Sequence, residues 1–140
     1  MGDDLIVNKA SSQTTHVYGR TLNSARMHHF VIDGTRDPKE ELTPVEVFLS
    51  SISACCVQWV EQFAREDEVS LYRLEVAITG SRTTEDPTRF QRVDIEVTAT
   101  GPDQAQMEDF VSRFKARCPL YRTVSAATEV VFSAQVEVAS

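Results

Sequence analysis

Three cysteines are the residues in this sequence whose type and spacing could support redox chemistry. Cys55 and Cys56 are adjacent in the stretch ISACCVQWVEQ, and Cys118 lies far downstream in RCPLYRTV. A thiolate can attack an electrophile and be regenerated by a second thiol, so a spaced pair suits redox catalysis. Free cysteine is also among the most often buried residues, where it acts as a small apolar side chain. An odd count that includes an adjacent pair does not fit a secreted disulfide framework.

The position of each cysteine predicts a different environment. Cys56 falls near the centre of the apolar stripe of a predicted helix, so we expect it in the core. Cys55 lies in the middle of the same helix, where a guanidinium would be needed to stabilise its thiolate. Cys118 precedes Pro119 and is placed to cap a short helix, which favours a thiolate. By these local arguments alone, Cys118 could be the more acidic of the two candidate nucleophiles.

Other polar residues give weaker signals. No C-x-x-C motif occurs, and His28 and His29 are adjacent on a predicted strand, so their side chains point to opposite faces. We therefore expect no metal and no cofactor. The cations Lys115, Arg117 and Arg122 flank the third cysteine and form either a solvated patch or a docking site for an acidic reductant.

The composition is that of one soluble globular domain. The chain has 140 residues, of which 41% are hydrophobic and 25% charged, enough for one core without disulfides. We predict a single domain over residues 1–140. The net charge of −7 disfavours nucleic acid or an anionic membrane as a partner. No apolar run is long enough to cross a bilayer, and residues 1–15 lack the layout of a signal peptide, so we expect a cytoplasmic protein.

Hydrophobic periodicity predicts an α+β order of elements. Alternating apolar and polar residues indicate strands, and the 3.6-residue rhythm indicates helices. Runs of strands separated by single helices, without regular βαβ alternation, favour an antiparallel sheet over a doubly wound fold. The expected elements are strands at 15–20 and 26–33 around a turn at 21–25, a charged loop at 33–42, a helix at 43–63, strands at 70–82 and 89–100, a helix at 101–118, a turn or short helix at 118–127, and a strand at 128–138.

The helix at 43–63 has the clearest signal. Thr43 is a good N-cap, Pro44 suits the first helical position, and Glu46 completes a capping box. Apolar residues follow along one side, while the other side carries small residues such as Ser50. A helix of this kind is expected to be buried on both faces.

Four stretches, in order along the chain, resemble the OsmC/Ohr superfamily, which comprises osmotically inducible protein C and organic hydroperoxide resistance proteins. TPVEVFLSSISACCVQWV resembles the head of the family's central helix. HHFVIDG resembles the family's strand that comes before the loop leading into this helix. GSRTTEDPTRFQRVDIEVTATG resembles the family's hairpin, and CPLYRTV resembles its second cysteine motif. The resemblance covers nearly the whole chain from about Thr15. Glu46 does not directly follow the helix-start proline, as it usually does in the hydroperoxide-resistance branch, so this sequence is nearer the OsmC-like branches.

The resemblance implies an α+β fold with antiparallel sheets around a long buried central helix, in an intertwined homodimer. It implies a thiol-dependent peroxidase that reduces organic (alkyl) hydroperoxides in oxidative stress defence. Cys55 matches the peroxidatic cysteine and Cys118 the resolving cysteine, while Glu46 and an arginine, Arg20 or Arg26, would activate the thiolate. The reductant would be a dithiol partner, a lipoyl or thioredoxin-like protein. The alternative is a non-catalytic dimer that binds a small molecule or a thiol.

Helix geometry separates Glu46 from Cys55. The two residues are nine positions apart, which is about 13–14 Å along the helix axis, and their side chains point to nearly opposite sides. If Glu46 assists Cys55, it must come from the partner chain or act through an arginine. We therefore expect an obligate homodimer with two composite sites.

Overall fold

The chain folds into two compact units, one up to Val47 and one from Phe48 onwards. The structure is a computed structural model that describes residues 4–36 and 39–138. The first three residues of the chain and residues 37–38 of the expected charged loop lie outside the described residues. The single domain expected over residues 1–140 stays a prediction. Within the described ranges, no helix has both the length and the apolar character needed to span a membrane.

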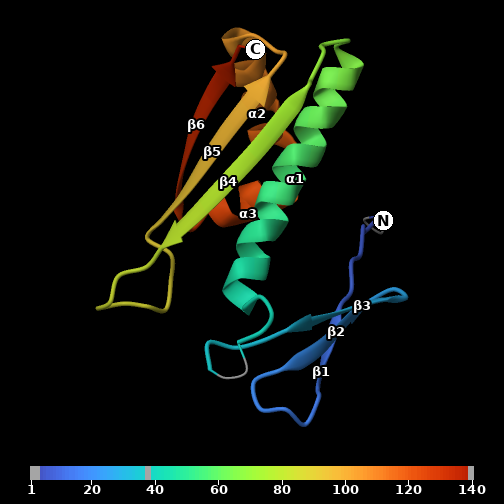
Figure 1. Cartoon of the computed structure of the whole chain (residues 1–140), viewed down its shortest axis with the longest axis vertical. Helices are drawn as coiled ribbons and strands as arrows, with labels where there is room; N and C mark the ends of the chain where they lie inside the picture. Colours follow the sequence, from blue (N-terminus) through green and yellow to red (C-terminus); the bar gives the residue numbers. More distant parts are fainter. Residues whose placement is uncertain (1–3, 37–38, 139–140) are drawn as a thin grey trace. The chain divides into compact units, whose positions relative to one another are not determined.

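The first unit contains a three-stranded antiparallel sheet in the order β1-β2-β3 (Figure 1). The buried residue Asn23, on the central strand, links the two neighbouring strands through its side chain. The Asn23 side chain accepts a hydrogen bond from Ser12 Oγ at 2.7 Å and donates one to the Phe30 carbonyl at 3.1 Å. The strands are β1 (Ser11–Thr14), β2 (Thr21–Ala25) and β3 (His28–Ile32).

The strand expected at 15–20 and the turn expected at 21–25 are both wrong. Residues 15–20 form a turn, in which His16 and Gly19 have positive φ values of 69° and 85°. Positive φ values are incompatible with an extended strand. Residues 21–25 instead form β2, which pairs with a strand on each side. The next expected strand is confirmed as β3.

The second unit contains most of the central helix and a sheet in the order β4-β5-β6. β4 and β5 are antiparallel, with Val76 opposite Val97, whereas β5 and β6 are parallel, with Ile95 opposite Phe132. The elements are α1 (Pro44–Glu66), which begins in the first unit, β4 (Arg73–Ser81), β5 (Arg92–Thr100), α2 (Gln104–Arg117), α3 (Pro119–Ser125) and β6 (Glu129–Glu137).

The parallel pairing of β6 differs from the antiparallel sheet that we expected. After β5 the chain passes through α2 and α3, and it enters β6 in the same direction as β5. Parallel neighbours need a connection of a dozen or more residues, often a helix, and α2 and α3 provide it. The α+β class and the long helix α1 are confirmed.

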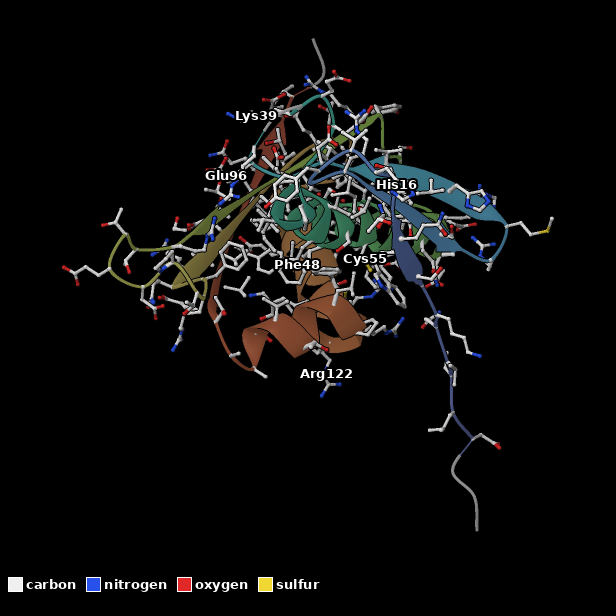
Figure 2. The ribbon with its side chains drawn as sticks, turned by 90° about the horizontal axis from the view of Figure 1, so that it is seen from below. His16, Lys39, Phe48, Cys55, Glu96 and Arg122 are labelled. Carbon is white, nitrogen blue, oxygen red and sulfur yellow. The ribbon has the colours of Figure 1, made fainter. Side chains whose placement is uncertain are left out.

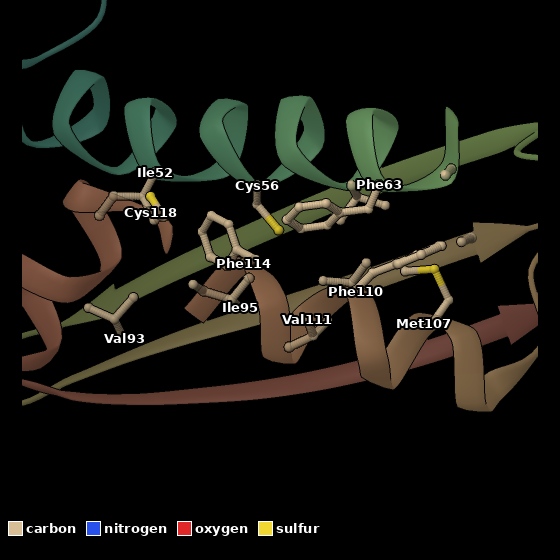
Figure 3. Packing of buried hydrophobic residues seen from close by; sticks show 14 residues of the cluster. Ile52, Cys56, Phe63, Val93, Ile95, Met107, Phe110, Val111, Phe114 and Cys118 are labelled. Atoms are coloured by element: carbon tan, nitrogen blue, oxygen red, sulfur yellow. The ribbon is translucent and has the colours of Figure 1, made fainter. Parts of the chain in front are cut away.

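The core of the second unit lies between α1, α2 and one face of β5 (Figure 3). The fully buried Cys56 belongs to it, as predicted. The opposite side of α1, which includes Ala54 and Gln58, is exposed in the single chain, so burial on both faces stays a prediction. The largest fully buried side chains of this core include Ile52, Val60 and Phe63 on α1, Val93, Ile95 and Val97 on β5, and Met107, Phe110 and Phe114 on α2.

Candidate functional site

Two of the predicted catalytic residues, Cys55 and Cys118, are in contact. Cys55 Sγ lies 3.3 Å from Cys118 Sγ, and either thiol can donate the hydrogen bond between them. Cys55 is half-buried on α1 (Figure 2), whereas Cys118 is fully buried where α2 meets α3 (Figure 3). Both are free thiols, and a disulfide would bring the sulfurs to about 2.0 Å. A small movement of the two sulfurs toward each other would therefore allow the Cys55–Cys118 disulfide to form.

The junction between α2 and α3 fixes the position of Cys118. Its N–H donates to the Phe114 carbonyl at 2.9 Å, and its carbonyl accepts from the Arg122 N–H at 3.0 Å. Pro119 occupies the first position of α3, where a missing N–H is tolerated. The Cys118 sulfur accepts from the Tyr121 N–H at 3.4 Å, which confirms the expected cap of a short helix.

Burial opposes ionisation of both cysteines on α1. It raises the pKa of Cys55, and the hydrogen bond and charge interaction with Cys118 act in the same direction. The indole of Trp59 lowers the pKa of Cys55, but its effect is smaller. Burial also raises the pKa of Cys56 to about 12. Cys56 is therefore suited to packing, and Cys55 needs a cation from outside these contacts to become a reactive thiolate.

Glu46 forms the capping box of α1 that the sequence predicts. The Thr43 N–H donates to the Glu46 carboxylate at 2.9 Å, and the Glu46 N–H donates to Thr43 Oγ1 at 3.3 Å. The hydrogen bond from the Thr43 backbone is the main reason that the pKa of Glu46 is lowered. Since Glu46 is exposed and engaged in this cap, its catalytic role stays a prediction.

Arg20 is held by Asp33, a buried carboxylate that the sequence does not single out. Arg20 Nε donates to Asp33 Oδ1 at 2.8 Å, and Arg20 Nη2 donates to Asp33 Oδ2 at 2.9 Å. Asp33 Oδ2 also accepts from the N–H groups of Glu40 and Glu41 at 2.9 and 3.0 Å. The Glu40 carboxylate accepts from Arg20 Nη2 at 3.2 Å. Asp33 therefore orients the Arg20 guanidinium and anchors the loop that follows β3.

The two candidate activating arginines have different surroundings. Arg20 is fixed by carboxylates, whereas Arg26 is exposed at the turn between β2 and β3, with a φ value of 56°. Both belong to the first unit and Cys55 to the second, so the role of either arginine stays a prediction. The only sequence signal for Asp33 is its place directly after an apolar strand.

Acid should weaken the Arg20–Asp33 pair in a defined pH window. The hydrogen bond from Arg20 lowers the pKa of Asp33 from its ordinary 3.8 to about 2, against the effect of burial. A carboxylate whose pKa is lowered by folding stabilises the fold above its unfolded pKa, and this stabilisation is lost as the pH falls from about 4 to about 2. The urea midpoint of the wild type should fall over this window, and that of Asp33→Asn should fall less.

Asp94→Asn is a suitable control for this pH measurement. Asp94 also forms a pair with an arginine, Arg92, but that pair lies at the surface. The Asp94→Asn variant should follow the wild-type pH dependence more closely than Asp33→Asn does. Equal pH dependence in the wild type and in Asp33→Asn would show that the Arg20–Asp33 pair does not contribute in this way.

The cations near Cys118 pack on neighbouring groups. Lys115 Nζ lies 4.8 Å from an aromatic ring centroid and Arg117 Cζ lies 5.5 Å from another, while Arg122 Nη1 donates to a backbone carbonyl at 3.5 Å. In the part of the chain that the structure describes, none of the three forms an ion pair with a carboxylate. A docking role for this patch stays a prediction.

Two further features of the described residues were candidates for a binding site. Across residues 4–36 and 39–138, no three His, Cys, Asp or Glu side chains gather in a way that could hold a metal ion. A hollow of about 700 Å³ lies between α1 and β4, with Gln58, Glu61 and Tyr72 in its lining. Its lining includes neither Cys55 nor Cys118, so we do not assign it to the thiol chemistry.

Solved structures show the same fold. A hypothetical protein from Aquifex aeolicus matches with a TM-score of 0.86 at 16% identity, covering 97% of this chain and 100% of that chain. The OsmC-like protein from Mycoplasma pneumoniae matches with a TM-score of 0.83 at 15% identity, covering 94% and 97%. An organic hydroperoxide resistance protein OsmC from Legionella pneumophila matches with a TM-score of 0.71 at 15% identity, covering 95% and 99%. At these identities the similarity shows the fold alone.

Sequence comparison adds the family. No curated protein sequence matches the chain. A family model described as OsmC-like protein matches residues 36–133, which is more than half of the chain and includes both Cys55 and Cys118. The predicted resemblance is thereby confirmed, and the chain belongs to the OsmC-like protein family.

Proposed function

We propose that this protein is a thiol peroxidase that reduces organic hydroperoxides in oxidative stress defence. The observation that carries the proposal is the 3.3 Å separation of the Cys55 and Cys118 sulfurs. A cysteine that is oxidised to sulfenic acid needs a second thiol within reach, and Cys118 is in that position. The name of the Legionella pneumophila relative, an organic hydroperoxide resistance protein, supports the substrate class.

The proposed cycle has three steps. The Cys55 thiolate attacks the O–O bond, keeps one oxygen as sulfenic acid, and the alcohol leaves after it takes up a proton. Cys118 then attacks the Cys55 sulfur, and water leaves as the disulfide forms. A dithiol reductant restores the two thiols by exchange and becomes a disulfide itself. We propose that this reductant is a lipoyl or thioredoxin-like protein of the cytoplasm.

The first step requires a cation that offsets the effect of burial on the pKa of Cys55. We propose Arg20, because Asp33 and Glu40 already orient its guanidinium. Glu46 cannot reach Cys55 along one straight helix, since nine positions correspond to about 13–14 Å. We therefore propose a homodimer in which each site combines Cys55 of one chain with Glu46 of the partner subunit.

Oxidation with one equivalent of cumene hydroperoxide tests the redox pair. The intact mass should fall by two hydrogens, and digestion should release a peptide pair joined through Cys55 and Cys118. Cys118→Ser is the matched control, because it cannot form this link. An unchanged mass, or a disulfide that involves Cys56 in place of Cys118, would contradict the proposed pair.

One observation favours a non-catalytic alternative. Burial raises the pKa of Cys55, as is typical of an inert structural thiol. A dimer of this fold that binds a small molecule or a thiol would need no activated cysteine. Steady-state consumption of cumene hydroperoxide with dithiothreitol separates the two functions. Turnover above that of a Cys55→Ser control supports the peroxidase, and its absence supports the binding protein.

Mixed dimers should recover activity from two inactive variants. Glu46→Ala and Cys55→Ser are each expected to inactivate both sites of their own homodimer. When the two variants are unfolded together and refolded, about half of the dimers are mixed, and each contains one intact composite site. Up to about a quarter of all sites should therefore recover peroxidase activity.

The same variants mixed without unfolding are the control and should stay inactive. Native mass spectrometry establishes that mixed dimers have formed. Inactive mixed dimers, or a wild-type protein that is monomeric in solution, would show that the sites are not shared between chains.

A further inference from the structure

The two sulfurs of the proposed pair differ in their access to solvent. Cys118 is 0% exposed, whereas Cys55 is only half-buried. We infer that the reductant attacks the Cys55 sulfur of the disulfide and that Cys118 is the leaving group. This inference deepens the proposed function and rests on the formation of the Cys55–Cys118 disulfide.

Access favours attack at Cys55. In thiol–disulfide exchange, the incoming thiolate must reach the sulfur that it attacks, on the side opposite to the leaving sulfur. Cys118 is a member of the buried core cluster that includes Ile52 and Phe114 (Figure 3). A thiol from solvent would have to open this core before it could reach the Cys118 sulfur. Cys55 packs at the margin of the same cluster and, in the single chain, keeps part of its surface in solvent.

One backbone N–H is placed to assist departure of the Cys118 sulfur. The Tyr121 N–H donates to Cys118 Sγ at 3.4 Å, and a hydrogen bond to the charged form of a group stabilises it. The Tyr121 ring centroid lies 5.9 Å from that of Phe114 and 5.6 Å from that of Phe132, which holds this part of α3 in place. Cys55, in the middle of α1, has helix backbone around it whose N–H groups are bonded within the helix. This hydrogen bond favours departure of the Cys118 sulfur, whereas burial of Cys118 opposes its charge, so access of the reductant to Cys55 carries the inference.

The bonds change in two steps. The first thiolate of the reductant bonds to Cys55 as the Cys55–Cys118 bond breaks, and the Cys118 thiolate takes up the proton that the reductant thiol released. The second thiol of the reductant then attacks the reductant sulfur of the mixed disulfide, closes the reductant's own disulfide and releases Cys55 as a thiol. Cys118 is thus the thiol that attacks the Cys55 sulfenic acid in the oxidative half-cycle and the leaving group in the reductive half-cycle.

The position of the mixed disulfide tests the inference. The wild-type protein is oxidised with diamide and treated briefly with 2-mercaptoethanol, a monothiol that has no second thiol to complete the reduction. After an acid quench, free thiols are blocked with N-ethylmaleimide and the peptides are identified by mass. We expect mercaptoethanol on Cys55 with maleimide on Cys118, in at least about tenfold excess over the reverse pattern.

Labelling of the oxidised protein in urea is the control. Both sulfurs are accessible in the unfolded chain, so the ratio of the two labelling patterns should fall to near one. Equal labelling in the native protein, an excess on Cys118, or an equally large excess in urea would overturn the inference. Failure of diamide to form the disulfide would overturn it as well. Because diamide replaces the hydroperoxide, a protein without peroxidase activity can still give the expected pattern, so the two proposals fail separately.

Discussion

Replacement of Cys55 by serine is expected to lower kcat/KM for cumene hydroperoxide by at least about a thousandfold, to the uncatalysed rate. A serine hydroxyl is not ionised near neutral pH, and it cannot hold the transferred oxygen as a sulfenic acid. Cys118 cannot take over the attack, because it is fully buried. Loss of the hydroperoxide with dithiothreitol as the reductant measures the effect.

Cys56→Ser is the matched control, since it makes the same exchange of one sulfur for oxygen at the neighbouring residue of the same helix. Cys56 is fully buried, so the new hydroxyl should lower the free energy of unfolding by about 1–3 kcal/mol. The activity of the folded Cys56→Ser protein should stay close to that of the wild type. An equal loss of activity in both variants would show that Cys55 is not the sole nucleophile.

Cys118→Ser should separate the first step from the rest of the cycle. Without a resolving thiol, Cys55 should consume about one equivalent of hydroperoxide and then remain as sulfenic acid. Dimedone should therefore label nearly all of Cys55 in this variant and almost none in the wild type, where the disulfide forms instead. Excess hydroperoxide should convert the sulfenic acid to sulfinic acid, and the variant should lose its activity permanently.

Dithiothreitol must be left out of this labelling experiment, because a small thiol can itself react with a sulfenic acid. The wild type treated in the same way is the control. Similar dimedone labelling in both proteins would mean that Cys118 does not resolve the sulfenic acid. No labelling in Cys118→Ser, despite consumption of the hydroperoxide, would rule out the sulfenic acid itself.

The central helix can be predicted from sequence because its signals are local. The capping box involves only Thr43 and Glu46, and the apolar stripe that places Cys56 in the core repeats within single turns. The second unit's strands alternate clearly for the same reason, with β5 burying every second residue.

The errors occur where pairing across the sheet outweighs local preference. β2 has the sequence TLNSA, which contains residues that are typical of turns, but both of its edges pair with other strands. The buried Asn23 side chain adds hydrogen bonds to both neighbouring strands. The direction of β6 is similarly a matter of which strand it meets after α2 and α3, and periodicity carries no information about that.

The candidate site likewise combines features that the sequence predicts with features that only the structure shows. The roles of Cys55 and Cys118 are suggested by their motifs, whereas their contact joins residues 63 positions apart and is visible only in the structure. The buried state of Asp33 depends on its bidentate bond to Arg20, and the alignment of the Tyr121 N–H depends on the geometry of the α2–α3 junction. Each of these is a three-dimensional relation between residues that look ordinary in the sequence.

Because β6 runs parallel to β5, the sheet is completed only after the chain has passed through both α2 and α3. Contacts between distant residues form late in folding, since the entropy of closing a long loop is lost before the contacts compensate for it. Since synthesis runs from the N-terminus, the proposed nucleophile on α1 leaves the ribosome well before its resolving partner, Cys118. The nascent chain would pass through a period in which Cys55 can be oxidised but not rescued, and this period ends only when α3 has docked and Cys118 is in place.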